Sequence, residues 1–155
     1  MASYRFSGTL PYRPEDLYRL VADVKQYPQF VPGCKGLEVL SRTPCLIKAR
    51  TDIGFGGFEG QFNSKVVLKP YKKIEIAYEK GGDLSQLHSG WGFKGNGASG
   101  CDVSFFITVE MSSFFYNLLL KGAIESMGSK MVEAFKKRAS EKLTPQGALK
   151  EENVL

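Results

Sequence analysis

The chain has 155 residues, of which 43% are hydrophobic and 24% charged, as is typical of one soluble globular domain with a sizeable core. No apolar run approaches the roughly 20 residues of a transmembrane helix, and the first residues lack the apolar core of a signal peptide. The net charge of +5 allows contact with RNA or anionic lipid but requires neither. The three cysteines show no metal-ligand or redox spacing and are expected to be reduced thiols.

The N-terminal region predicts a strand followed by a helix. Residues 3–12 alternate apolar and polar side chains, which favours a strand. Residues 13–24 place leucine and valine at helical spacing after Pro14, a residue suited to a first helical turn. This helix is expected to end before Pro28, because the residue before a proline disfavours helical geometry.

A short proline-containing segment, residues 23–36, follows the helix with the sequence "DVKQYPQFVPGCKG". Two prolines bracket an apolar pair, which is unusual for a solvated loop and incompatible with a long regular helix. We expect a short helical turn here. Two interpretations stay open: a plug that seals one end of the core, or a lid that hinges at Gly33 and Gly36.

From residue 35 to residue 110 the hydrophobic pattern changes to a period of two. Six segments show it, at residues 37–42, 45–51, 56–70, 72–80, 86–95 and 100–111. Turns rich in glycine, or in lysine and proline, separate them. This pattern is typical of an antiparallel meander with one dry face and one solvated face.

A long amphipathic helix is predicted over residues 112–143, about 45 Å at 1.5 Å per residue. Residues 144–155 are polar and are expected to form a flexible tail, so the domain covers residues 1–143. The element order indicates an α+β fold of about seven strands, with the last helix covering the dry face of a curved sheet. A single helix does not fill the whole concave face, so large side chains or a cavity must occupy the remaining volume.

The proline-containing segment, within "LYRLVADVKQYPQFVPGCKG", resembles the ubiquinone-binding branch of the START-like, polyketide cyclase/dehydrase superfamily. The later motifs "SGWGF", "CDVSFFITVEMSS" and "MVEAFKKRA" are similar to that branch and occur in the same order. The resemblance extends from about Tyr4 to Leu143. Relatives near the eukaryotic quinone proteins usually carry tryptophan where this chain has Gly33. With a glycine there, the chain is more similar to the bacterial relatives described as toxins.

The resemblance implies a helix-grip fold, in which a curved antiparallel sheet wraps the C-terminal helix around a hydrophobic tunnel. It implies non-enzymatic binding of a polyprenyl quinone such as ubiquinone in support of respiration, with no other cofactor. The alternative that it implies is a ribosome association toxin, which binds the large ribosomal subunit and inhibits subunit joining. A cyclase or dehydrase type of enzyme is the third. We expect a bacterial cytoplasmic protein, with peripheral contact at the inner membrane face allowed and no DNA partner.

The predicted tunnel lining combines apolar side chains of the sheet, the last helix and the proline-containing segment. Its members are Phe30, Val31, Phe58, Phe62, Tyr78, Trp91, Phe93, Phe105, Leu120, Ile124, Met127 and Met131. Taken singly, each is the kind of residue that more often fills a core. Gly128 is interpreted as leaving room for a prenyl chain. Tyr27 and Tyr78 are candidates to orient a polar head group.

A basic group near the end of the last helix is the predicted docking surface. It comprises Lys136, Lys137, Arg138 and Lys142, which either form a solvated face at a helix C-terminus or contact ribosomal RNA or anionic lipid. No catalytic or metal site is predicted, because the single histidine, His88, and the strand carboxylates fall on the solvated face.

Overall fold

The computed structural model describes residues 1–55, 57–97 and 100–145. The strands are β1 (Ala2–Leu10), β2 (Cys34–Arg42), β3 (Leu46–Phe55), β4 (Phe58–Lys69), β5 (Lys73–Gly81), β6 (Leu84–Gly95) and β7 (Cys101–Met111). The helices are α1 (Pro14–Ala22), the 3-10 turn η1 (Val24–Gln26), α2 (Tyr27–Phe30) and α3 (Phe114–Lys142). Apart from residues 144 and 145, the predicted tail lies outside the described residues.

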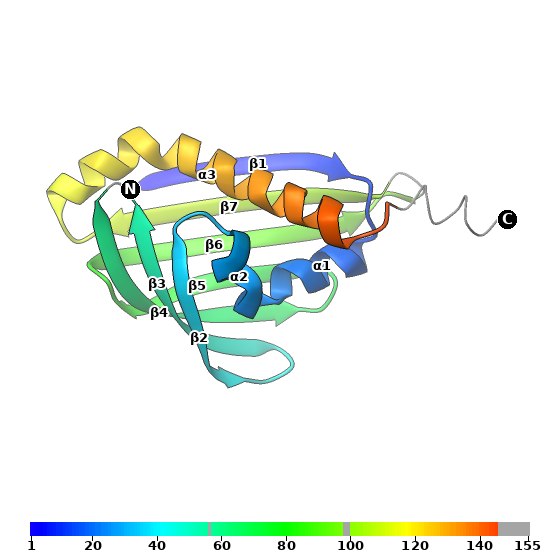
Figure 1. Ribbon diagram of the computed structural model, residues 1–155, viewed down its shortest axis with the longest axis horizontal. Helices are drawn as coiled ribbons and strands as arrows, with labels where there is room; N and C mark the ends of the chain where they lie inside the picture. Colours follow the sequence, from blue (N-terminus) through cyan, green and yellow to red (C-terminus); the bar gives the residue numbers. More distant parts are fainter. Residues whose placement is uncertain (56, 98–99, 146–155) are drawn as a thin grey trace, which may run out of the picture.

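The strands form one antiparallel sheet in the order β1-β7-β6-β5-β4-β3-β2. The first strand pairs with the last, so that Phe6 lies opposite Phe105, and the remaining strands follow as consecutive hairpins. Register shifts interrupt the pairing of β2 with β3, of β4 with β5 and of β6 with β7, and such bulges bend a sheet. The long helix α3 lies across one face of this sheet (Figure 1). The predicted α+β fold, seven strands with a long C-terminal helix over the sheet, is confirmed.

The alternation of side chains determines which face α3 covers. In β7 every odd-numbered residue from Cys101 to Met111 points to the covered face, while Asp102 and Ser104 are exposed. In β4 the even-numbered residues are the inward ones, and Phe62 and Val66 are buried there. Burial of these apolar side chains between α3 and the sheet supplies the main stabilisation of the fold.

Helix α3 begins at Phe114, two residues later than its periodicity predicts, because Ser113 caps its N-terminus. The Ser113 Oγ accepts a hydrogen bond from the Tyr116 N–H at 3.4 Å, as an N-cap. The Asn117 side chain accepts a hydrogen bond from the Met111 N–H and donates one to the Met111 carbonyl, both at 2.8 Å. The first turn of α3 is therefore tied to the end of β7.

The helix predicted over residues 13–24 ends two residues early, and the short helical turn expected in the proline-containing segment is α2. Helix α1 ends at Ala22, the 3-10 turn η1 follows, and Pro28 stands in the first turn of α2. Because Pro28 lacks an N–H, it fits a first helical turn but not the interior of a longer helix.

Within the described part of the chain, no helix combines the length and apolarity that crossing a bilayer requires.

Candidate functional site

A cavity of about 190 Å³ lies between α3 and the concave face of the sheet. Helix α3 contributes Leu120, Ile124, Met127, Gly128, Met131 and Phe135, and the strands contribute Leu37, Ala49, Ile53, Phe55, Phe62, Val66, Ile76, Leu84, Leu87, Trp91, Phe105, Ile107, Val109 and Met111. Val24, Tyr27, Val31, Pro32 and Gly33 close the side beside α2. The lining is overwhelmingly apolar, which suits a lipophilic ligand.

Besides the rings of Tyr27 and Trp91, four polar side chains border this cavity, and none of them is a charged group. They are Cys34, Thr51, Ser64 and Ser89. The Ser89 Oγ donates a hydrogen bond to the Phe106 carbonyl at 3.0 Å. Burial raises the pKa of the Cys34 thiol to about 11, so this thiol is neutral near pH 7. These groups offer hydrogen bonds to a ligand without placing a charge in the apolar space.

The proline-containing segment forms one wall of the cavity and is packed against α3. Tyr27 lies 5.5 Å from Phe135 and Phe30 lies 5.0 Å from Phe135, measured between ring centroids, and both pairs meet edge to face. The Tyr27 hydroxyl donates a hydrogen bond to the Val21 carbonyl. Gly33 has a φ of +81°, a conformation that favours glycine, and its carbonyl accepts a bond from the Gly54 N–H. The segment is therefore a packed wall of the cavity in this structure.

Both tyrosines considered for a ligand head group use their hydroxyl protons elsewhere. Burial raises the pKa of Tyr27 well above its usual range, and its hydrogen-bond partner is the backbone of α1. The Tyr78 hydroxyl donates to the Gly81 carbonyl at 2.9 Å. Tyr27 still borders the cavity, whereas Tyr78 is not part of its lining, and the other polar side chains there are those of the four residues named above, which the sequence analysis did not propose as ligand contacts.

Eight of the predicted tunnel residues line the cavity: Val31, Phe62, Trp91, Phe105, Leu120, Ile124, Met127 and Met131. The other four lie elsewhere. Phe30 borders a surface groove beside α1, and Phe93 borders a smaller cavity beneath α1. Phe58 packs against Tyr116, and Tyr78 lies behind Phe62. Strand alternation predicted inward positions for Phe58, Tyr78 and Phe93, and the lid interpretation placed Phe30 at the tunnel mouth, but the segments that cover each residue decide whether it meets open volume.

Gly128 brings α3 close to β1, which differs from the expectation of room for a prenyl chain. A Cβ at this position would lie 2.3 Å from Cδ1 of Tyr4 and 2.4 Å from its Cγ. The Tyr4 ring therefore occupies the space that the missing side chain leaves. The backbone of Gly128 still borders the cavity.

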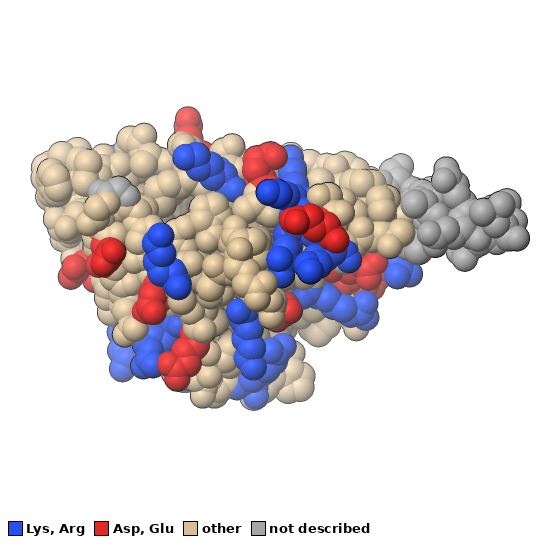
Figure 2. Space-filling view, in the orientation of Figure 1, with Lys and Arg blue, Asp and Glu red and all other residues tan. Residues whose placement is uncertain are grey.

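The four predicted docking residues do not form one free basic surface. Lys136 pairs with Glu133 at 3.3 Å and lies 4.8 Å from the centroid of Phe6. Arg138 donates to the Gln29 Oε1 at 3.0 Å and lies over the Phe30 ring. Lys137 and Lys142 are exposed. Lysine and arginine side chains gather on the face shown in Figure 2 around α2 and the second half of α3.

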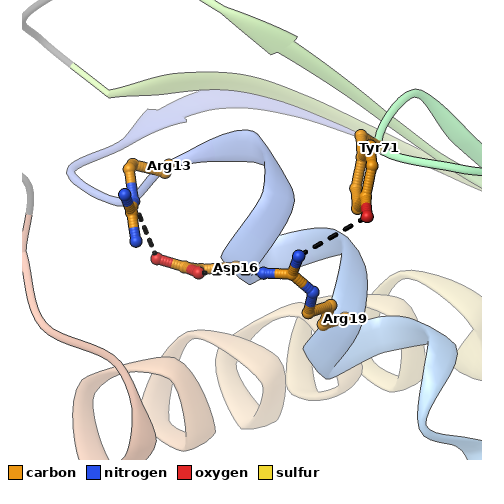
Figure 3. A network of polar contacts seen from close by, with 4 residues as sticks. All are labelled: Arg13, Asp16, Arg19 and Tyr71. Carbon is orange, nitrogen blue, oxygen red and sulfur yellow. Dashed lines mark hydrogen bonds and ion pairs between the residues drawn. The ribbon is translucent and has the colours of Figure 1, made fainter.

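Next to this surface, a polar network holds α1 against the sheet (Figure 3). The Arg13 Nε donates to the Asp16 carboxylate at 3.2 Å, and Arg19 lies 3.7 Å from the same carboxylate. Arg19 also donates to the Tyr71 hydroxyl at 3.5 Å, from α1 to the turn between β4 and β5. Both arginine side chains remain more than half exposed, so these contacts are surface interactions.

The outward position predicted for His88 agrees with the structure. His88 is exposed on β6, 3.6 Å from Glu75 and 4.9 Å from the ring of Phe106 between centroids. The Lys73 ammonium, bonded to the Glu75 carboxylate at 2.6 Å, lowers the pKa of Glu75. This small polar cluster lies on the solvated face, on the opposite side of the sheet from the cavity.

Comparison with known proteins agrees with this architecture. Residues 10–136 match the family described as polyketide cyclase/dehydrase and lipid transport. The chain belongs to this family. Among solved structures of similar fold, an 18 kDa protein from Caulobacter crescentus has a TM-score of 0.73 and 26% identity, over 91% of this chain and 97% of the other. An aromatase/cyclase from Streptomyces sp. R1128 has a TM-score of 0.79 over 90% and 94% of the two chains, but at 14% identity it shows the fold alone.

Two relatives within this polyketide cyclase/dehydrase family differ in their named roles. The ribosome association toxin RatA of Pseudomonas aeruginosa is 32% identical over 87% of this chain and 93% of its own length. The mitochondrial coenzyme Q-binding protein COQ10 homolog B of Xenopus laevis is 29% identical over 88% of this chain and 57% of its own length. The predicted START-like resemblance is confirmed, and the relatives favour the toxin alternative over the quinone function.

Proposed function

We propose that this protein binds a lipophilic ligand, without chemical turnover, in the cavity between α3 and the sheet. The observation that carries the proposal is the apolar lining of a 190 Å³ cavity, closed on one side by the proline-containing segment. Removing apolar surface from water, at about 25 cal/mol per Å², supplies the affinity. The proposed tunnel contacts are the eight predicted residues that line the cavity.

A polyprenyl quinone such as ubiquinone is the ligand that we propose for the cavity. Its tail matches the apolar walls, and its carbonyl oxygens accept hydrogen bonds from hydroxyl groups such as those of Thr51 and Ser64. Similarity to a coenzyme Q-binding protein supports this ligand class. The respiratory role then consists of shielding the quinone from water during its use.

We propose ribosome association as the second candidate, and for the cellular role the relatives support it better than respiratory quinone binding. The partner would be the large ribosomal subunit in the cytoplasm. The exposed Lys137 and Lys142 are the side chains we propose to contact ribosomal RNA, because Lys136 and Arg138 are engaged within the protein. A ligand in the cavity is compatible with this role.

The ligand is tested by mass spectrometry of the organic extract of protein purified from its native host. We expect a stoichiometric polyprenyl quinone in the wild-type extract and its loss from Met127→Glu, which places a charge in the lining. Ser126→Glu adds the same charge at an exposed neighbour on α3 and is expected to retain the ligand. Circular dichroism confirms that both variants are folded. A lipid-free wild-type extract would contradict the proposal.

Ribosome association is tested by co-sedimentation with separated subunits at increasing salt. We expect the Lys137→Gln/Lys142→Gln variant to bind more weakly and the log–log salt slope to fall by roughly 1.5 to 2. Lys48→Gln/Lys65→Gln removes the same charge from a cross-strand pair on the outer face of β3 and β4, and is expected to bind normally. Equal loss in both variants, or none in the first, would reject this surface.

A further inference from the structure

The start of α3 exposes four large apolar side chains that neither proposed role explains. The exposed fractions are 77% for Phe114, 63% for Phe115, 54% for Leu118 and 45% for Leu119. We call these four residues the α3 tip. They fall at helical positions i, i+1, i+4 and i+5, so they share one side of the first turns. Exposed apolar residues that cluster in this way mark an interaction site more often than isolated ones do.

The exposure of the α3 tip is built into the fold. Asn117, in the middle of the tip sequence, makes two 2.8 Å hydrogen bonds to the backbone of Met111. Tyr116 packs edge to face on Phe58, with centroids 4.9 Å apart. Since the inward side of these turns is held by the sheet, the four tip side chains are fixed on the outward side.

The tip carries no charge, which decides the kind of partner. Residues 111–120, "MSSFFYNLLL", contain no acidic or basic side chain, and the first cation beyond them is Lys121. Figure 2 shows the start of α3, at the upper left, free of lysine and arginine, whereas those side chains gather around α2 and the second half of α3. An uncharged apolar surface excludes nucleic acid as its partner, because phosphate contacts need cations.

The size of the tip favours a bilayer over a second protein. Two phenylalanines and two leucines at these exposures present a few hundred Å² of apolar surface. A stable protein–protein interface needs about 800 Å² from each partner and matching shape. Insertion into the acyl-chain boundary of a membrane needs neither, and phenylalanine and leucine are side chains that interfacial helices use for it.

The tip also lies over one end of the cavity. The side of α3 opposite the tip carries Leu120 and Ile124, which line the cavity together with Leu84 and Met111. We propose that the α3 tip docks the protein on lipid bilayers by inserting Phe114, Phe115, Leu118 and Leu119 below the headgroups, independently of lipid charge. A protein docked in this way has the end of its apolar cavity next to the acyl chains.

The test is flotation of the full-length protein with phosphatidylcholine vesicles at low and high salt. We expect binding at both salt concentrations, and a loss of at least about tenfold in Phe114→Ser/Leu118→Ser. Leu40→Ser/Val67→Ser changes two exposed apolar residues on strands β2 and β4, and is expected to bind like wild type. The extract experiment above reports on the cavity alone, so a failure of the tip and a failure of the ligand are distinguishable.

A second readout places the tip in the bilayer directly. In Phe115→Trp, brominated phosphatidylcholine is expected to quench the fluorescence of the new tryptophan. The quenching should exceed that seen in wild type, whose Trp91 is buried. Three results would overturn the proposal. They are the absence of binding to phosphatidylcholine, binding that requires anionic lipid and vanishes in salt, and a wild-type dimer that Phe114→Ser/Leu118→Ser converts to monomer.

Discussion

Single residues at the contact between α3 and β1 determine how closely the helix approaches the sheet. Gly128 faces the Tyr4 ring and has no space for a side chain, whereas Gly122, on the same helix, has no neighbouring atom within 4 Å of a Cβ position. Close packing therefore requires glycine at position 128, whereas at position 122 glycine only lowers the helix propensity.

Gly128→Ala is expected to lower the free energy of unfolding by about 1–3 kcal/mol, because the added Cβ overlaps Tyr4. Gly122→Ala is the matched control and is expected to raise it by about 0.5–1 kcal/mol, through helix propensity alone. Urea denaturation measures both. A stabilising Gly128→Ala would show that α3 does not approach β1 this closely.

Tyr27 links stability to alkaline pH. Its pKa in the folded protein lies above the value of 10.0 for a free tyrosine, because burial disfavours the charged form. The unfolded chain therefore releases this proton first, so the stability contributed by the neutral hydroxyl is complete below pH 10 and is lost as pH rises further.

We expect the unfolding free energy of wild type to fall more steeply above pH 10 than that of Tyr27→Phe, by about 1.4 kcal/mol per pH unit. At neutral pH Tyr27→Phe is expected to cost about 1–3 kcal/mol, since the buried Val21 carbonyl loses its donor. Denaturation curves from pH 8 to pH 11 measure both effects. Parallel pH profiles of the unfolding free energy for wild type and Tyr27→Phe would contradict the role of Tyr27 in the alkaline loss of stability.

At the scale of elements, the junction between β7 and α3 turns the chain without a long loop. Residues 112 and 113 are the only ones between the strand and the helix in this described stretch. Ser113 caps the helix, and Asn117 bonds both backbone groups of Met111. These polar contacts fix the direction in which α3 leaves the sheet, and thereby the position of its tip.

Asn117→Ala is expected to lower the free energy of unfolding by about 1–3 kcal/mol, because two backbone groups of Met111 lose their partners. Asn117→Asp keeps the acceptor for the Met111 N–H and is expected to lose less. Hydrogen exchange of the first turn of α3 should accelerate in the alanine variant. Unchanged exchange in that turn would mean that packing alone holds the junction.

At the scale of the whole molecule, Phe135 joins the three layers. Its ring meets Tyr27 and Phe30 of α2 and lies 4.9 Å from the ring of Trp91 on β6, between centroids. It also borders the main cavity. Such a residue holds helix, sheet and proline-containing segment in register around the ligand space.

Phe135→Ala is expected to cost about 3–5 kcal/mol, by loss of burial and creation of a cavity. Phe115→Ala, at a site that is 63% exposed, is expected to change stability by less than about 0.5 kcal/mol. Thermal and urea unfolding measure the pair. Similar small changes in both would show that the proline-containing segment is not anchored through Phe135.

The sequence by itself determined the elements and their inner faces. The period of two from residue 35 to residue 110 and the helical stripe through Leu120 and Ile124 depend only on local geometry, and they agree with the observed strands and with the buried side of α3. The START-like motifs supplied the arrangement of the sheet and the existence of a cavity as expectations.

Only the tertiary structure decided which inward side chains meet the cavity and which pack against a neighbour. Trp91 and Phe93 share a strand face, yet one borders the main cavity and the other lies under α1. The space beside Gly128 is occupied by the ring of Tyr4, which is far away in the sequence. Lys136 and Arg138 contact partners that no local sequence pattern reveals. The physical reason is that periodicity specifies a direction relative to the backbone, whereas open volume and free charge depend on what other segments bring to the same place.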